Sequence, residues 1–137
     1  MINEPLGFEV TLQQPYEQAI ETVTAALKAQ GFGILTRIDV RATLKEKLGA
    51  EFRPYAILGA CNPPLAHRAL TAAPQMGLLL PCNVTVEESQ PGVSLVRIAN
   101  PQAMLASAGN PNDADLQAVA DQATAKLKAV TGALSQL

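Results

Sequence analysis

Two cysteines, each followed by an asparagine, are the residues of this chain best suited to chemistry. Cys61-Asn62 ends an apolar run and precedes two prolines, and Cys82-Asn83 comes directly after Pro81. The pair Asn62-Pro63 is typical of a helix start, because Asn caps the first turn and Pro suits its first position. A thiol beside a helix N-terminus ionises more readily than a free one. The sequence therefore indicates Cys61 as a candidate reactive thiol.

A simpler interpretation is favoured for both cysteines, because a cysteine among apolar residues usually packs as a small hydrophobic side chain. This interpretation is stronger for Cys82, which would lie on the same face of a strand as Val84 and Val86. If the strands that carry them are neighbours, the two thiols could approach the Cα separation of about 5.5 Å that a disulfide needs. Cys61 and Cys82 are thus candidate functional thiols, and no catalytic residue is assigned.

Three residues are candidate supports for these thiols. Asn62 is expected to cap the helix, and Asn83 to bond to backbone that Pro81 leaves free. His67 lies one turn along the predicted helix and could lean over Cys61, since helical side chains point toward the N-terminus. Its neighbour Arg68 favours instead an exposed position for His67.

The spacing of Cys61, Cys82 and His67 argues against a metal centre, because it lacks the short Cys-x-x-Cys or His-x-x-x-His units that preorganise zinc. No Gly-rich phosphate loop, nucleophile elbow or dinucleotide fingerprint occurs. We therefore expect neither a metal nor a cofactor.

Composition narrows the class of protein. A chain of 137 residues has the usual size of one domain, predicted over residues 1–137, and its 48% apolar content with 4% aromatics predicts an aliphatic core. Ten basic and twelve acidic side chains give a net charge of -2, so nucleic acid is not an expected partner. The start of the chain lacks the features of a secretory signal, and its apolar runs are far shorter than the about 20 residues that span a bilayer. We expect a soluble, cytoplasmic protein without a membrane partner.

Hydrophobic periodicity and turn residues predict the elements that position the cysteines. In chain order these are a strand at 8–12, a helix from Pro15 to Gly31, a strand at 32–40, a short helix at 43–48 that Gly49 ends, a strand at 55–61, a helix at 63–73, strands at 76–88 and 93–99, and a final helix. Asp113 is expected to cap the final helix, whose apolar stripe includes Leu127, Val130 and Leu134.

Several details of these elements are specific enough to check. Ile34 and Ile38 are expected on one face of their strand, and Gly59 predicts a bulge or the close approach of another group. Pro81 is expected to interrupt the strand at 76–88. The segment 100–112 reads as a loop with at most one helical turn, in which Met104 plugs an edge of the core.

This order predicts an α+β fold of two layers, a mainly antiparallel sheet with helices on one face, in the order strand, helix, four strands and helix with short helical insertions. The strand at 55–61 is apolar on both faces, with Ile57 on one and Leu58 on the other. The face without helices therefore needs a cover, and a homodimer is the simplest one.

Two segments carry a resemblance to a known family. Residues 55–66, YAILGACNPPLA, and residues 77–84, GLLLPCNV, resemble the paired signatures of the uncharacterised family called domain of unknown function 302. Asn100-Pro101 with Met104-Leu105, and the Ala-rich last helix, are similar to its carboxy-terminal part. The resemblance implies a fold like that of the TATA-binding protein repeat, and it implies no established activity.

Two classes of function stay open, and the residues favour the first. One is a non-catalytic binding or accessory protein, acting as a homodimer, whose small-molecule ligand occupies an apolar cleft between the sheet and the long helix or between subunits. The other is a thiol-dependent protein that carries sulfur, transfers redox equivalents or senses oxidants through Cys61, with Cys82 as resolving thiol.

Overall fold

The fold is described from a computed structural model, which describes residues 5–108 and 112–137. Strands and helices alternate along most of the chain, and a 3₁₀-helix, η1, precedes the fourth strand. In order the elements are β1 (Gly7–Leu12), α1 (Tyr16–Ala29), β2 (Gly33–Asp39), α2 (Val40–Leu48), β3 (Tyr55–Cys61), α3 (Pro63–Ala72), η1 (Pro74–Leu79), β4 (Cys82–Gln90), β5 (Val93–Ala99), α4 (Pro101–Ser107) and α5 (Ala114–Ser135).

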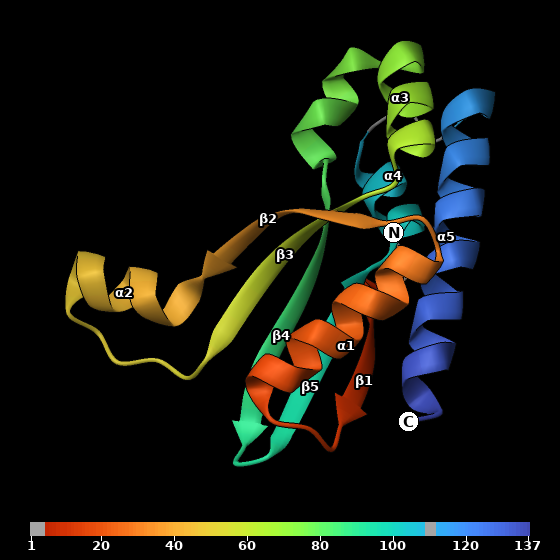
Figure 1. The fold of residues 1–137 in the computed structure, drawn as a ribbon. Helices are drawn as coiled ribbons and strands as arrows, with labels where there is room; N and C mark the ends of the chain where they lie inside the picture. Colours follow the sequence, from red (N-terminus) through yellow and green to blue (C-terminus); the bar gives the residue numbers. More distant parts are fainter. Residues whose placement is uncertain (1–4, 109–111) are drawn as a thin grey trace.

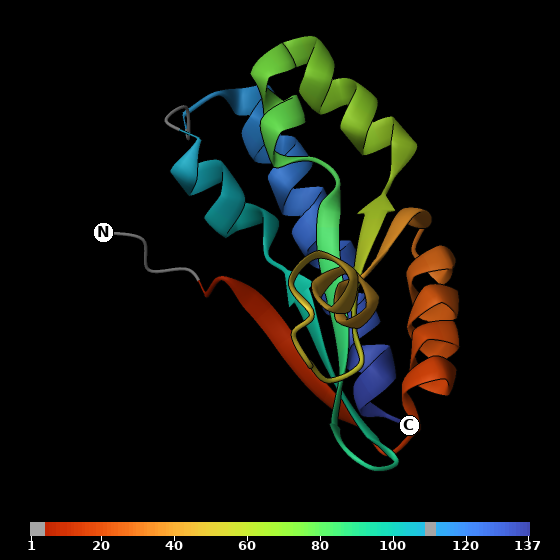
Figure 2. The same ribbon diagram turned by 90° about the vertical axis from the view of Figure 1, so that its left-hand side faces the viewer.

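The strands form one sheet in the order β1-β5-β4-β3-β2, and every neighbouring pair is antiparallel. Helices α1 and α5 pack on one face of this sheet, while α3, η1 and α4 gather at one of its ends (Figure 1 and Figure 2). This arrangement confirms the predicted two-layer α+β fold. No helix in the described part of the chain combines the length and the apolar character needed to cross a bilayer.

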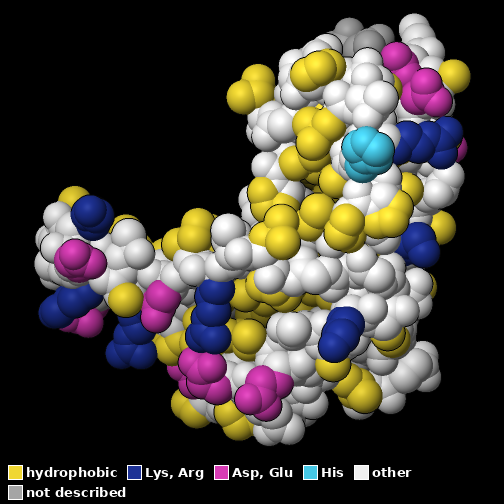
Figure 3. Space-filling view, turned by 45° about the horizontal axis from the view of Figure 1, so that its top comes forward, with side chains coloured by type: hydrophobic (Ala, Val, Ile, Leu, Met, Phe, Trp, Pro, Cys, Tyr) yellow, Lys and Arg dark blue, Asp and Glu magenta, His cyan; other side chains and the backbone are white. Residues whose placement is uncertain are grey.

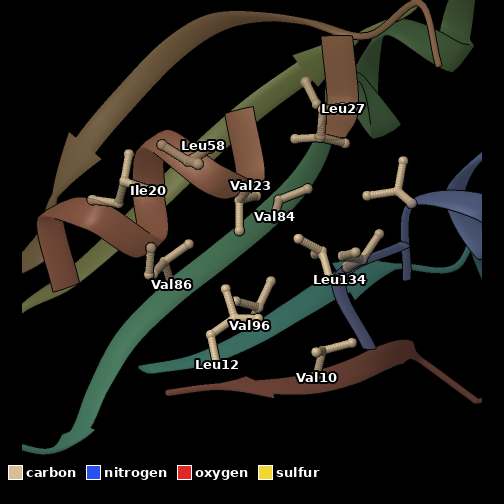
Figure 4. Close-up of a cluster of buried hydrophobic side chains, with 14 of the residues drawn as sticks. Val10, Leu12, Ile20, Val23, Leu27, Leu58, Val84, Val86, Val96 and Leu134 are labelled. Atoms are coloured by element: carbon tan, nitrogen blue, oxygen red, sulfur yellow. The ribbon is translucent and has the colours of Figure 1, made fainter. Parts of the chain in front are cut away.

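The core lies between the sheet and helices α1 and α5, as Figure 4 shows. Side chains alternate across a strand, so every second residue of β4 and β5 faces the helices, and Val84, Val86, Val96 and Ile98 are all fully buried. Helix α5 completes this core with Leu127, Val130 and Leu134, at the helical spacing that the sequence predicts.

Helix boundaries follow the capping residues that the sequence predicts. Asn62 accepts a hydrogen bond from the backbone N–H of Leu65 at the start of α3, and Asp113 does the same for α5. Gly31 and Gly49 follow α1 and α2 with positive φ angles of 84° and 65°, the left-handed conformation that ends a helix without strain.

The predicted fourth strand was wrong in its first half. Residues Pro74–Leu79 form the 3₁₀-helix η1, and β4 begins only at Cys82. The physical reason is proline at both ends of the segment: Pro74 suits the first position of a helix, and Pro81 has no N–H to donate to a strand ladder. Pro81 thus precedes β4 instead of interrupting it.

The faces assigned to β2 were also wrong. The register of β2 against β3 shifts between Ile34 and Thr36, which is a β-bulge. Ile34 therefore pairs with Ala60 on the helix side, whereas Ile38 pairs with Ile57 on the open side. One extra residue in a strand reverses the alternation beyond it, so the two isoleucines lie on opposite faces.

Two further expectations need correction. Residues Pro101–Ser107 form helix α4 instead of a loop with one turn, because the Asn100 side chain accepts a hydrogen bond from the backbone N–H of Gln102 and Pro101 begins the helix. Residues 109–111 of the predicted loop lie outside the described residues. The apolar spacing within residues 63–73 predicts that Leu70 points inward with Leu65 and Ala69, yet Leu70 of α3 is exposed.

The end of β2, helix α2 and the following loop project away from the rest of the molecule (Figure 1 and Figure 2). We call residues 37–54 the arm. Helix α2 runs farther than predicted, since Asp39 caps it by accepting a hydrogen bond from the backbone N–H of Ala42. It contains no buried residue, and Leu48 at its end is 74% exposed.

Side chains of neighbouring segments approach β3 closely at Gly59, as a glycine inside a strand predicts. A Cβ atom there would overlap Thr36 Oγ1 and would lie only 2.8 Å from Pro81 Cγ. We therefore expect Gly59→Ala to lower the free energy of unfolding by about 2 kcal/mol through overpacking, as measured by urea denaturation. Adding Thr36→Ala, which removes one of the two overlapping groups, should restore part of the loss, and no restoration would contradict this explanation.

Candidate functional site

The carboxyl ends of β3 and β5 lie at the same end of the sheet, because both strands are antiparallel to β4 between them. Each is followed by an Asn-Pro helix start, Asn62-Pro63 for α3 and Asn100-Pro101 for α4. Strand β4 begins at this end with Cys82. The fold therefore gathers both cysteines and both Asn-Pro helix starts at one end of the sheet.

A pocket of about 60 Å³ lies at this end, between the strands and the helices α3, η1, α4 and α5. We call it the sheet-end pocket. The described residues that line it carry no charged side chain, and nearly all are apolar, including Leu65, Leu105 and Ala120. A volume of this size exceeds the about 10–15 Å³ that one water molecule requires and suits a ligand of a few heavy atoms.

Cys61 and Cys82 both line the sheet-end pocket as free thiols. Cys61 ends β3 and is half-buried, whereas Cys82 begins β4 and is 9% exposed. Ala60 is the direct partner of Cys82 across the strand pair, so the two cysteines are offset by one residue. They can share a pocket despite strand alternation because the pocket lies where the strands end.

Burial dominates the electrostatics of Cys82. Removal from water, with a smaller contribution from the charge of ionised Cys61, raises the pKa of the Cys82 thiol to about 11. Cys82 therefore stays protonated at neutral pH and is a poor nucleophile.

The structure places the three candidate supporting residues, Asn62, His67 and Asn83, in different positions relative to the sheet-end pocket. Asn62 caps α3 and also lines the sheet-end pocket. His67 lies on the exposed surface of α3 and is absent from the lining of the pocket (Figure 3). Asn83 is exposed and borders the open face of the sheet, and among the described residues its side chain makes no bond to backbone of the kind expected. Of the three, only Asn62 joins the thiols.

The sequence did not identify Met76 of η1 and Met104 of α4 as site residues, yet both line the sheet-end pocket. Met104 had been expected only to plug a core edge. Asn100 was not identified as a buried polar residue beside the site either. It is 1% exposed, and its side-chain Nδ2 donates a hydrogen bond to the Pro5 carbonyl at 2.9 Å. The repeated Asn-Pro dipeptide was the available signal, since it marks two helices that start beside one another.

The open face of the sheet holds a second, larger hollow of about 730 Å³. Its polar part includes Arg97, which donates hydrogen bonds to Glu9 at 2.8 Å and to the buried Glu87 at 2.7 Å. Arg53 also donates a hydrogen bond to Glu87, at 3.1 Å. Two arginines thus pair with two glutamates, and the surface is neutralised. Leu6 and Leu78 border the same hollow and are 85% and 88% exposed.

Within residues 5–108 and 112–137, no group of three or more His, Cys, Asp or Glu side chains is arranged to hold a metal ion. The sheet-end pocket offers instead two thiols, one amide and apolar surface. Such a lining can hold a small ligand that has no net charge once bound, or allow the two thiols to react with each other.

Comparison with known proteins identifies the relatives of this chain. Residues 8–134 match the family described as "Domain of unknown function DUF302". The crystal structure of an uncharacterized conserved protein DUF302 from Bacillus stearothermophilus is similar at 30% sequence identity, with a TM-score of 0.79, and the match covers 93% of this chain and 96% of that one. No curated protein matches. Since the family match spans nearly the whole chain and the solved structure shares its fold, this chain belongs to the DUF302 family.

Proposed function

We propose that this chain is a non-catalytic binding protein whose small ligand occupies the sheet-end pocket, and that it acts as a homodimer. The observation that carries the first part is the pocket itself, an apolar space built jointly by β3, β4, α3, η1, α4 and α5. Its volume of about 60 Å³ limits the ligand to a few heavy atoms. The fold of the TATA-binding protein repeat, a single domain over residues 1–137 and a cytoplasmic location stay predictions alongside it.

Xenon tests the pocket, because apolar cavities of this kind admit xenon atoms. Under xenon pressure we expect shifts in the backbone amide resonances of the lining residues, and no such shifts would refute the proposal. Ala120→Leu should abolish them by filling the pocket, since Ala120 is 4% exposed and lines it. Ala125→Leu is the matched control, because it makes the same change on the exposed side of α5.

The exposed apolar side chains of the arm support the proposed homodimer. Leu35, Ile38 and Leu48, on the arm and the strand that carries it, are 65%, 48% and 74% exposed. A two-turn helix with no buried residue gains little from its own chain, since most helical stability comes from packing an apolar face. We infer that the arm packs against a second copy, in the hollow bordered by Leu6 and Leu78.

The distribution of charged side chains also favours a second copy of this chain as the partner of the arm. The arm carries five basic and three acidic side chains, while the rest of the chain carries five basic and nine acidic ones. In Figure 3 the arm projects on the left with its Lys and Arg side chains exposed. A twofold dimer in which each arm contacts the partner's body would bring the basic excess of the arm near the acidic excess of that body, around the neutralised part of the hollow.

Light scattering during size-exclusion chromatography tests the dimer. The wild type should have twice the chain mass of 14.4 kDa. Leu48→Asp should yield the single-chain mass, because it puts a charge into the proposed interface. Leu137→Asp is the matched control, since Leu137 is also 74% exposed but lies at the end of the chain. A wild type that runs as a monomer at tens of micromolar would rule the dimer out.

A thiol-dependent function is the second candidate, favoured by the presence of both thiols in one pocket. The Cys61 thiolate would attack an external disulfide and release one external thiolate. Cys82, once deprotonated, would then attack the Cys61 sulfur, form the Cys61–Cys82 disulfide and release the second external thiol. Two protein thiols are thereby oxidised and the external disulfide is reduced.

The raised pKa of Cys82 argues against this candidate, because little Cys82 thiolate exists at neutral pH. Alkylation by iodoacetamide at pH values from 5 to 9, followed by mass spectrometry, distinguishes the thiol-dependent function from the binding function. Rapid modification already at low pH in the wild type, and its loss in Cys61→Ser, would support the thiol function. Slow modification that needs denaturant would support the binding protein.

A further inference from the structure

The four described residues that carry sulfur all line the sheet-end pocket. They come from four different elements: Cys61 ends β3, Met76 lies in η1, Cys82 begins β4 and Met104 lies in α4. The rest of the described lining is aliphatic or aromatic except for the side chain of Asn62. The fold thus concentrates its soft ligand atoms at one small site.

We propose that the sheet-end pocket binds one soft monovalent metal ion of the Cu(I) class, held by the Cys61 thiolate and the thioethers of Met76 and Met104. This inference rests on the proposed binding function and names its ligand. Thiolate and thioether sulfur select Cu(I) over harder cations, which prefer carboxylate, carbonyl and water. The described lining contains no carboxylate and no imidazole, so a harder ion would lack its usual ligands.

Size and charge both favour a single monovalent ion. A pocket of about 60 Å³ accommodates one ion beside its ligands. Because the described lining carries no charged side chain, a net charge in the site would be costly. Cu(I) with one thiolate and two thioethers is neutral, whereas a divalent ion with the same ligands would carry one positive charge.

The binding step balances without any oxidant or reductant. Cu(I) replaces the proton of the Cys61 thiol, one Cu–S bond forms, and one proton leaves to solvent. Cys61 is half-buried, which gives this proton a route to water. Cys82 is the more buried thiol and stays neutral beside the ion, so the site does not need it as a thiolate.

Anaerobic titration with Cu(I) against a chromogenic Cu(I) chelator, with native mass spectrometry for stoichiometry, tests the proposal. We expect one ion per chain, with about tenfold or greater loss of affinity in Met76→Leu and in Met104→Leu. These substitutions conserve volume and cost less than about 1.5 kcal/mol, so the variants stay folded. Cys61→Ser should lose binding, and Cys82→Ala should keep it.

Three outcomes would overturn the proposal. They are the absence of Cu(I) binding in the wild type, an affinity that both methionine variants leave unchanged, and loss of binding in Cys82→Ala, which would mean a charged bis-thiolate centre. If Cu(I) fails to bind while xenon still enters the pocket, the metal assignment alone is refuted. If neither binds, the proposed pocket function fails as well.

Discussion

Leu105→Ala is expected to lower the free energy of unfolding by about 3 kcal/mol, because truncating a buried leucine loses apolar contact and leaves a cavity. Leu105 is 3% exposed, packs with Leu116 and Ala120, and lines the sheet-end pocket. The space that it vacates should join the existing pocket, so the variant should take up xenon more strongly than the wild type while being less stable. Urea denaturation and xenon-induced amide shifts measure the two effects.

Leu137→Ala provides the comparison, because it deletes the same atoms from a side chain that is 74% exposed. A substitution at such a surface position usually changes stability by less than about 0.5 kcal/mol. Both variants must be measured at the wild-type protein concentration, since the proposed dimerisation would make stability depend on it. Equal effects at the two leucines would contradict the buried position of Leu105.

Alkaline pH should destabilise the protein through Cys82. Burial raises the pKa of this thiol from an ordinary value of 9.0 to about 11. Below pH 9 the folded and unfolded chains both keep the proton. Between pH 9 and pH 11 the unfolded chain releases it first, so stability falls as pH rises, and the loss from this thiol approaches about 3 kcal/mol above pH 11.

The variant Cys82→Ala isolates this contribution, because the wild type and the variant share every other ionisable side chain. The difference in unfolding free energy between wild type and variant should be constant from pH 6 to pH 8.5 and shrink between pH 9 and pH 11. Urea denaturation at each pH measures it. A difference that does not change with pH would mean that Cys82 is accessible to water in the folded protein.

Elements governed by local rules were predictable from the sequence. The strand Tyr55–Cys61 was predicted with its observed bounds, and Asn62 and Asp113 cap the helices that they were expected to cap. In each case the residues that define the element are adjacent or lie at a regular spacing. The family was predictable for the same reason, since the resemblance was carried by a short run of residues around each cysteine, and the family model matches residues 8–134.

Features that depend on contacts between distant segments were not predictable. The bulge at Leu35 exists only in the pairing of β2 with β3, and it reversed the faces of Ile34 and Ile38. The helix Pro101–Ser107 was missed because its alanines and Pro101 read as irregular chain until the Asn100 side chain is seen to cap it. The inclusion of Met76 and Met104 in the pocket follows from the convergence of four elements, which no local pattern records.

The close approach at Gly59 has a consequence for how the two ends of the molecule communicate. Gly59 has Thr36 of β2 on one side and Pro81, the residue before Cys82, on the other. Strand β2 carries the arm, so we expect a displacement of its backbone at Thr36 to reach Pro81, and with it the wall of the sheet-end pocket, through Gly59. A partner that moves the arm would then change the affinity for a ligand in the pocket, and the ligand would change the affinity for the partner by the same factor. For the proposed ligand and the proposed partner, we therefore expect Gly59 to couple the two binding equilibria.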